Sequence, residues 1–312
     1  MDPVVRNLAE RHHGLLTTAQ LRLAGTSHKS VRHWVAASEL IRLTRGLYVL
    51  GDHYPRDRAA RHLLLARGSL LLVPDGVLSH GTALLAHGIP VITVPPEVRL
   101  QRPLSPGVQR KGQVRRQGIV IDATQTPTTM TTSYGPTVPV GTAILQHAKA
   151  RGVEEGLASA DAAVRAALVP PRELREQASS DMGPHSRRAR QVADLADGRI
   201  ESVGESRLRF VCSLGGVDVV PQATIRDESG TFVARVDFRV RGTNVLLEFD
   251  GRVKYAAANG SALWDEKRRE DRLRRLGYVV VRVVWADLAD PMALIARIQD
   301  ALLSERSSRA SA

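Results

Sequence analysis

The chain is poor in cysteine: Cys212 is the single one among 312 residues. One thiol cannot build an internal disulfide framework or a zinc site based on cysteine ligands, so both are excluded. Cys212 follows Phe210 and Val211 in an apolar run, where we expect a buried, unreactive thiol rather than a nucleophile. The sequence also lacks a glycine-rich phosphate-binding loop.

Long apolar runs are missing as well. No hydrophobic run approaches the ~18 residues that a transmembrane helix needs, and no amphipathic stretch offers an anchor for a membrane surface. The first residues, Met1, Asp2 and Pro3, do not begin a basic-then-apolar signal pattern. We therefore expect a soluble cytoplasmic protein with no membrane partner.

Positive charge is abundant: the net charge is +12. This balance favours a polyanionic partner, with nucleic acid ahead of an anionic membrane, although arginine-rich proteins without a nucleic-acid role also exist. Residues 1–199 hold 26 Lys and Arg against 16 Asp and Glu, whereas residues 200–312 hold 18 against 16. The last third is thus nearly neutral, and it is distinguished by where its acids lie. The length predicts two or three domains, each large enough for its own core.

The first fifty residues have the pattern of three short helices followed by a hairpin. Thr17 or Thr18 can cap the second helix and Ser27 the third. Two apolar runs flank Thr44-Arg45-Gly46, which is a hairpin signal. This order predicts a winged helix-turn-helix domain. The expected helices cover residues 3–11, 18–23 and 29–37, and the expected strands cover residues 40–43 and 47–50.

Two segments of this region resemble the N-terminal domain of AbiEi-type antitoxins and their relatives. They are residues 14–21 (GLLTTAQL) and residues 40–48 (LIRLTRGLY). The resemblance covers roughly residues 1–50 and implies a winged helix that binds DNA.

The side chains expected to reach DNA come from the third helix and from the wing. On a winged helix they can contact bases or phosphates in the major groove and in the adjacent minor groove. Winged helices also serve as protein-docking modules, and that alternative stays open. The predicted DNA-binding residues here are His28, Lys29, Ser30, Arg32, His33, Arg42 and Arg45. His12, His13, His80 and His87 are not accompanied in the sequence by the further metal-binding residues that a metal site would need. They are interpreted as core or surface residues.

The pattern of residues 56–198 predicts a connecting α+β region, and it resembles a block that is also found in the AbiEi relatives. Residues 77–88 have the pattern of a strand end that enters a helix, and residues 179–186 that of a linker or helix-entry loop. Further helices are expected over residues 57–67, 141–150, 153–167 and 187–195, and short strands over residues 91–94 and 118–121.

From residue 201 the pattern becomes regular and indicates an α/β domain. Helices are expected over residues 202–214, 263–276 and 291–303, and strands over residues 219–220, 232–238, 245–249 and 278–284. The Ser/Arg/Ala tail from Ser304 is expected to fray.

Three acids recur at the ends of these strands. Asp237 ends one strand, and Glu248 and Asp250 end the next. Because side chains alternate along a strand, Glu248 and Asp250 share a face, and a hairpin can place Asp237 beside them. Converging carboxylates repel one another unless a cation neutralises them. Hard oxygen ligands suit Mg²⁺ or Mn²⁺, which can activate water for attack on a phosphate. We predict a metal site here; the alternative is a set of solvated acids at strand ends.

The same region resembles the PD-(D/E)XK nuclease superfamily, and within it a family related to very-short-patch mismatch-repair endonucleases. The matching segments are residues 204–206 (GES), 236–238 (VDF), 247–252 (LEFDGR), 267–273 (KRREDRL) and 277–282 (GYVVVR). The resemblance implies that Asp237 and Glu248 are metal ligands and that Glu205 is an auxiliary acid.

The sequence departs from that superfamily's pattern at two positions. Asp250 stands where a lysine is usual, and Lys254 stands where close relatives often have a histidine. A cation is still needed near the attacking water or the leaving phosphate. Lys254 and Lys267 are the candidates, and Lys254 is preferred because it lies nearer the acids; either can equally be a surface lysine. The predicted catalytic set is Glu205, Asp237, Glu248, Asp250, Lys254 and Lys267.

The helix expected after the acids is strongly basic. Arg268, Arg272 and Arg275 fall on one helical face and can follow phosphates beside the acids. Alternatively, the helix is simply solvated, and its own acids, including Glu270 and Asp271, pair with those arginines.

These observations predict an α+β multidomain protein. It has a winged helix-turn-helix domain (1–55), an α+β connecting domain (56–198), a restriction-endonuclease-like α/β domain with a central mixed sheet (199–305) and a tail (306–312). The leading hypothesis is a DNA-binding protein with an endonuclease-like domain that uses Mg²⁺ or Mn²⁺. The alternative is a non-catalytic transcriptional regulator or antitoxin with a degenerate nuclease fold. A homodimer and a toxin or other regulatory partner stay open.

Overall fold

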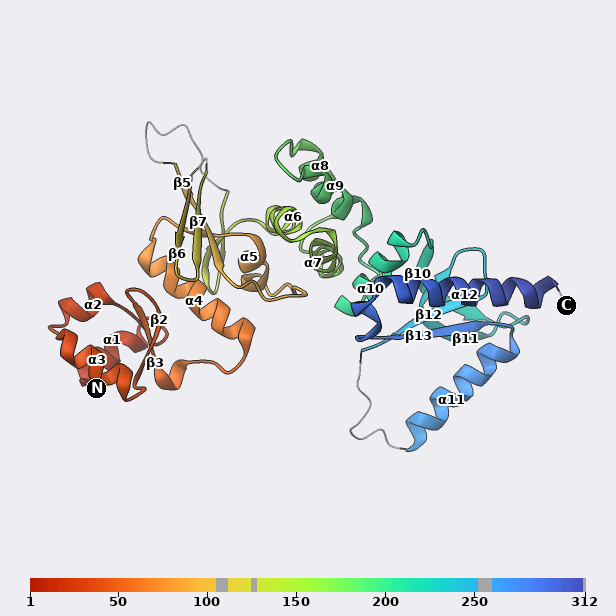
Figure 1. Cartoon of the computed structure of the whole chain (residues 1–312), viewed down its shortest axis with the longest axis horizontal. Coiled ribbons are helices and arrows are strands. Elements are labelled where there is room, and N and C mark those ends of the chain that lie inside the picture. Colours follow the sequence, from red (N-terminus) through yellow and green to blue (C-terminus); the bar gives the residue numbers. More distant parts are fainter. Residues whose placement is uncertain (105–111, 125–127, 252–259, 311–312) are drawn as a thin grey trace. The chain divides into compact units, whose positions relative to one another are not determined.

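The computed structural model describes residues 1–104, 112–124, 128–251 and 260–310, without the side chains of residues 260–267 and 309–310. The chain divides into two compact units (Figure 1). Unit 1 comprises Met1–Gly156 and Arg172–Gln191, and unit 2 comprises Leu157–Pro171 and Val192–Ala312. Along the helices described in these ranges, no segment is long and apolar enough to cross a membrane.

Unit 1 begins with the expected helices and hairpin, and local capping explains where the helices start. Asp2 accepts from the Val4 amide, Thr17 and Gln20 form a reciprocal capping box, and Ser27 accepts from the Ser30 amide. A short strand before the second helix adds to the predicted elements. They are α1 (Pro3–Glu10), β1 (Leu15–Thr17), α2 (Thr18–Leu23), α3 (His28–Ala36), β2 (Leu40–Thr44), β3 (Leu47–Leu50) and the 3₁₀ turn η1 (Gly51–His53).

The N-terminal sheet, with strand order β1-β3-β2, is covered on both faces. Leu16 and Leu50 pack with Trp34 and the other buried residues of α1–α3. Leu15 and Leu47 pack on the opposite face, against apolar residues of α4 (Arg58–Leu72). Residues 1–55 therefore share a core with the helix that follows them.

A second mixed sheet occupies the rest of unit 1. Its order is β6-β7-β5-β4-β9-β8, with β5 parallel to β7 and β4 parallel to β9. The strands are β4 (Val77–Leu78), β5 (Val98–Pro103), β6 (Gln113–Arg116), β7 (Ile119–Thr124), β8 (Met130–Thr132) and β9 (Gly135–Thr137). The helices of this unit include α5 (His80–Ala86), α6 (Val140–Arg151) and α8 (Pro171–Ser180). Helices α7 (Val153–Arg165) and α9 (Ser186–Leu195) are each divided between the two units.

One strand expected in this region is absent from the described residues. Residues 91–94 are β-branched in composition but form no strand, and β5 begins at Val98 instead. Pro90, Pro95 and Pro96 surround the segment. Since a proline nitrogen cannot donate to a strand ladder, these residues prevent regular pairing there.

Unit 2 is built on the sheet β10-β11-β12-β13, in which β12 and β13 are parallel and the other neighbours antiparallel. The predicted order of helices and strands and the predicted mixed pairing of the strands are both confirmed for the described residues. The elements are α10 (Val203–Leu214), β10 (Val219–Arg226), β11 (Phe232–Val240), β12 (Val245–Asp250), α11 (Gly260–Arg275), β13 (Val279–Val284), η2 (Asp287–Ala289) and α12 (Pro291–Ala310).

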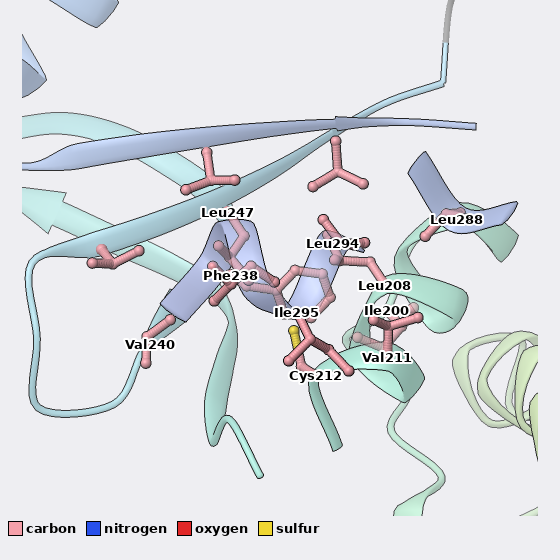
Figure 2. Packing of buried hydrophobic residues seen from close by; sticks show 14 residues of the cluster. Ile200, Leu208, Val211, Cys212, Phe238, Val240, Leu247, Leu288, Leu294 and Ile295 are labelled. Atoms are coloured by element: carbon pink, nitrogen blue, oxygen red, sulfur yellow. The ribbon is translucent and has the colours of Figure 1, made fainter. Parts of the chain in front are cut away.

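The two faces of this sheet are covered by different helices. Figure 2 shows Phe238 and Leu247 of the sheet meeting Leu208 and Cys212 of α10 and Ile295 of α12. The other face packs against Leu273 of α11. The expected inert thiol is confirmed, because Cys212 is 0% exposed and burial raises its pKa to about 12.

The expectation of a frayed tail from Ser304 is wrong for the described residues. Helix α12 continues to Ala310. Glu305 is 3% exposed, and its carboxylate accepts a hydrogen bond from the backbone amide of Asn244 at 3.2 Å. This bond anchors the last turns of the helix to the loop before β12, so the serines of the tail remain helical.

Candidate functional site

Helix α3 exposes most of the side chains predicted to reach DNA. His28, Lys29, Arg32 and His33 are exposed. Ser30 is half-buried and engaged in the helix cap, because its amide donates to Ser27 Oγ at 3.0 Å and the two hydroxyls lie 2.8 Å apart. On the inner side, Trp34 packs in the core and fixes the orientation of the helix.

The hairpin beside α3 presents two exposed arginines. Arg42 lies on β2, where its Nε donates to the Thr44 carbonyl at 3.4 Å. Arg45 lies in the two-residue loop between the paired residues Thr44 and Leu47. The loop's second residue, Gly46, has φ +86°, a conformation that suits glycine. The tight turn thus holds Arg45 at the tip.

A cavity of about 850 Å³ lies between α2, α3, this hairpin and the β6–β7 hairpin. We call it the arginine cavity. Its charged or titratable lining consists of His28, Tyr48 and five arginines, and no Asp or Glu belongs to the lining that the structure describes. Of the predicted DNA-binding residues, His28, Arg42 and Arg45 line it, whereas Lys29, Arg32 and His33 lie elsewhere on α3. The other three arginines are Arg22, Arg115 and Arg116.

The sequence alone does not indicate that these three arginines line the cavity. Arg22 lies on an exposed side of α2, and nothing in its neighbourhood distinguishes it from any other surface arginine. Arg115 and Arg116 reach the cavity only through the long-range fold, because β6 lies far along the chain from the β2–β3 hairpin. The contact that joins the two hairpins is a 2.7 Å hydrogen bond from Thr44 Oγ1 to the Gln117 carbonyl.

In unit 2, Asp237 lies next to the point where the regular pairing between β11 and β12 ends. The ladder between β11 and β12 includes the pairs Phe238–Leu247 and Arg239–Leu246. Beyond them, the Phe249 amide donates to Asp237 Oδ2 at 2.7 Å. Asp237 thus fills the opening between the strands with its carboxylate.

The two halves of β11 also join different cores. Val236 packs on the α11 side, whereas Phe238 packs on the α10 and α12 side. Residues two apart on a regular strand share a face, so the strand is irregular at Asp237. On β10, Gln222 lies between Pro221 and Ala223, which pair with Phe238 and Val236, and it has φ +52° although it is not glycine. Such outliers cluster at functional sites, where the surrounding structure maintains them.

Several acids act on Asp237. Burial raises its pKa to about 6; the Phe249 amide lowers it, and the charges of Glu205, Glu248 and Glu201 raise it. Burial is the largest of these causes, and the neighbouring carboxylates add to it. The structure thus brings the predicted Glu205, Asp237 and Glu248 within electrostatic reach of one another.

Glu205 is held in place by the start of α10. It is 6% exposed, and its carboxylate accepts from the Glu201 amide at 3.0 Å and from Ser202 Oγ at 2.8 Å. The Gln222 amide group donates to the same carboxylate at 3.0 Å. Glu205 thus caps its own helix and links it to the irregular position on β10.

Glu248 faces the opposite side of the sheet. Its carboxylate lies 2.9 Å from a guanidinium nitrogen of Arg269 on α11. Asp250, the predicted third ligand, is half-buried at the end of β12, opposite Val284 of β13. Close by, Trp285 packs edge-on against Phe249 with ring centroids 5.1 Å apart. The sequence did not indicate Arg269 as a partner of Glu248, because that contact depends on how α11 lies on the sheet.

These carboxylates fit a divalent cation in chemical type, and burial together with the neighbouring acids disfavours the charged form of Asp237. Their described arrangement is less favourable. Across the residues with described positions, no three His, Cys, Asp or Glu side chains are grouped as metal ligands. Arg269 contacts Glu248, and Glu205 caps its helix. A bound ion would have to draw Glu248 away from Arg269.

The two candidate lysines both follow β12 in the chain. Lys254 lies outside the described residues, and Lys267 is placed only as a backbone position of α11. The predicted arginine face of α11 is partly engaged. Arg272 forms an ion pair with Asp227 at 2.7 Å, and Arg275 Nε donates to the Asp271 carbonyl at 3.3 Å. Arg268 is exposed.

Comparison with known proteins identifies the N-terminal segment. The model of a family described as transcriptional regulator, AbiEi antitoxin, matches residues 3–51. The chain therefore carries an AbiEi-type antitoxin or transcriptional-regulator domain at its N-terminus, and the predicted resemblance is confirmed for that segment. None of the curated proteins matches the chain. The predicted resemblance of unit 2 to nucleases stays a prediction.

Proposed function

We propose that this protein is a DNA-binding transcriptional regulator that contacts DNA with an N-terminal winged helix. The arginine cavity is the observation that carries the proposal. It joins α3 and the hairpin in one concave surface whose charged lining is wholly basic. The match of residues 3–51 to a family of transcriptional regulators supports the same assignment.

The contacts follow from the geometry of winged helices. The second helix of a helix-turn-helix lies in the major groove, and residues on its outer face contact base edges. Here α3 takes that place, with Lys29, Arg32 and His33 toward the bases. Arg42 and Arg45 on the wing contact phosphates or the adjacent minor groove, because guanidinium groups bind phosphate oxygens well.

Protein docking is the other use of a winged helix, and the surface chemistry argues against it for this face. A docking surface is enriched in aromatic residues and depleted of charge at its centre. The large exposed apolar side chains of the module include Val4, Leu23 and Val35, and none of these lines the arginine cavity. The cavity has the composition that suits a polyanion.

The salt dependence of DNA binding tests this proposal. Each phosphate contact contributes about 0.9 to the slope of log affinity against log salt concentration. We expect Arg42→Ala/Arg45→Ala in the full chain to lower the slope by nearly two. Arg172→Ala/Arg175→Ala removes two exposed arginines of α8 outside the cavity and is the matched control. A wild-type slope in the Arg42/Arg45 variant would place DNA binding elsewhere.

A second candidate function, endonuclease activity, rests on the acids around Asp237. A carboxyl with a pKa of about 6, beside Glu205 and Glu248 at an irregular point of the sheet, has the character of a site rather than of solvated surface acids. We propose that unit 2 is a nuclease-like domain in which Asp237 and Glu248 hold Mg²⁺ or Mn²⁺, with Asp250 as the third predicted ligand.

Such an ion supplies an activated water and neutralises phosphate charge when bound. Asp237 and Glu248 would orient it, and Arg269, once released from Glu248, would be available to a phosphate. The alternative is that unit 2 keeps the fold without the reaction. A plasmid-nicking assay with Mg²⁺ or Mn²⁺, and with EDTA as the control, separates the two. Cleavage that disappears with EDTA supports the nuclease, and its absence under all metal conditions supports a non-catalytic regulator.

A further inference from the structure

The β6–β7 hairpin repeats the form of the wing beside it. In the wing, Arg45 and Gly46 form a two-residue loop between paired residues. In the second hairpin, Gln117 and Gly118 form a two-residue loop between the paired residues Arg116 and Ile119. Gly118 has φ +76° and Gly46 has φ +86°. Both hairpins thus end in tight turns with arginine in or next to the loop.

The two hairpins are joined at their turns. Thr44, the last residue of β2, is 3% exposed, and its hydroxyl donates to the Gln117 carbonyl at 2.7 Å. A hydrogen bond at a buried site is costly to leave unmade. It therefore fixes the second turn against the wing. The buried Ile119, which directly follows the second turn, also lines the cavity.

Strand β6 is unusually exposed and basic. All four of its residues, Gln113–Arg116, are exposed. Arg115 forms an ion pair with Glu97 at 3.3 Å, but its side chain remains 63% exposed. An exposed pair of this kind contributes little stability, so it does not explain the arginines at the turn.

Part of this positive charge has no partner within the described residues. Arg22, Arg45 and Arg116 form no ion pair there, although all three line the same cavity. Like charges gathered in a concave surface raise its potential and attract a polyanion. Guanidinium groups stay protonated, so this charge does not relax by titration.

We infer that the β6–β7 hairpin is a second DNA-contacting arm, in which Arg115 and Arg116, together with Arg22 of α2, bind the same phosphate backbone as the wing. The inference rests on the proposed function, because it assigns further residues to the same DNA interface. The DNA-binding surface therefore extends beyond residues 3–51, the segment that matches the regulator family.

The role assigned to these residues is phosphate binding and not base reading. The hairpin lies beside the wing rather than on α3, and contacts to the backbone fix register without reading sequence. Removal of the two arginines should consequently weaken binding equally for all DNA sequences. It should also reduce the salt slope by about 0.9 for each phosphate that the hairpin no longer binds.

The test uses the full chain and a fluorescent duplex, with binding followed by anisotropy at several salt concentrations. We expect Arg115→Ala/Arg116→Ala to lower the slope by nearly two. We expect Arg115→Lys/Arg116→Lys to keep most of it, since lysine also binds phosphate as a point charge. Arg172→Ala/Arg175→Ala controls for the loss of net charge. Arg116→Ala alone leaves the ion pair of Arg115 with Glu97 intact and should lower the slope by about 0.9.

The outcomes separate this inference from the proposed function. If Arg42→Ala/Arg45→Ala lowers the slope while Arg115→Ala/Arg116→Ala behaves like the control, the second arm is refuted and the winged helix stands. If neither pair changes the slope, both proposals are refuted. If the Lys variant loses as much as the Ala variant while its thermal unfolding is unchanged, charge is not the cause and the inference is refuted.

Discussion

Replacing Asp237 with asparagine should stabilise the protein at neutral pH. The folded-state pKa of Asp237 is about 6, above its ordinary value of 3.8. Folding therefore favours the protonated form, and the associated stability is complete below pH 3.8 and is lost as pH rises through 6. Asparagine keeps an oxygen that can accept from the Phe249 amide but carries no charge to repel Glu205 and Glu248.

The size of the effect follows from the pKa. The difference between 3.8 and about 6 corresponds to about 3 kcal/mol at 1.36 kcal/mol per pH unit. Solvent screening of this half-buried side chain reduces the expectation to roughly 1–2 kcal/mol. For a unit of this size, that gain raises the midpoint of thermal unfolding by roughly 3–8 °C.

Calorimetry of the full chain at about pH 7.5 and about pH 4, on either side of the raised pKa, measures this effect. We expect Asp237→Asn to unfold at a higher temperature than wild type at the higher pH, and the difference to vanish toward the lower one. Asp300→Asn removes an exposed acid of α12 and controls for net charge. A difference that is the same at both pH values would refute the argument, because it would show that the unfavourable burial of the charged Asp237 carboxylate is not the cause. If Mn²⁺ binds, it should raise the midpoint of wild type more than that of the variant.

Three further results are expected. Thr44→Val keeps every arginine of the cavity but removes the hydrogen bond to the Gln117 carbonyl. We therefore expect the free energy of unfolding to fall by about 1 kcal/mol and DNA binding, measured by anisotropy, to weaken although the charge of the cavity is unchanged. Binding equal to that of wild type would show that DNA binding does not depend on this link between the hairpins. Cys212, with its pKa raised to about 12, should resist thiol reagents in the native chain and react only after denaturation, and rapid native labelling would contradict its burial. If unit 2 cleaves DNA, Glu248→Ala should abolish nicking while DNA binding persists, since the carboxylate acts mainly in the transition state. If Lys254 supplies the missing cation, Lys254→Ala should slow nicking more than Lys267→Ala does. The reverse order would assign that role to Lys267 of α11.

Local signals explain which parts of the fold could be predicted. Ser27 caps α3 by accepting a hydrogen bond from an amide three residues away, and the loop of Arg45 and Gly46 closes the β2–β3 hairpin. Both are determined by neighbours in the sequence, so pattern alone predicted them. The segment 91–94 shows the limit of composition: its β-branched residues favour a strand, but the surrounding prolines prevent it.

Contacts between distant segments could not be predicted in the same way. Arg115 and Arg116 line the arginine cavity only because the β6–β7 hairpin lies against the β2–β3 hairpin. Glu248 pairs with Arg269 because of how α11 lies on the sheet. The sequence identified Asp237 and Glu248 as notable acids, but not that Glu205 and Glu248 approach Asp237 from opposite faces. In each case the missing information was the packing of whole elements.

Sequence selection by the chain tests most directly whether α3 binds DNA. Duplexes with a random central region are incubated with the full chain, and the bound fraction is sequenced over several rounds. We expect wild type to enrich one motif and Arg32→Ala, which changes an exposed residue of α3, to relax the preference at one position by about 1–3 kcal/mol. Arg172→Ala, on α8, should enrich the wild-type motif unchanged. Identical motifs from wild type and Arg32→Ala, or no enrichment by wild type, would contradict the assignment of α3 as the element that reads DNA.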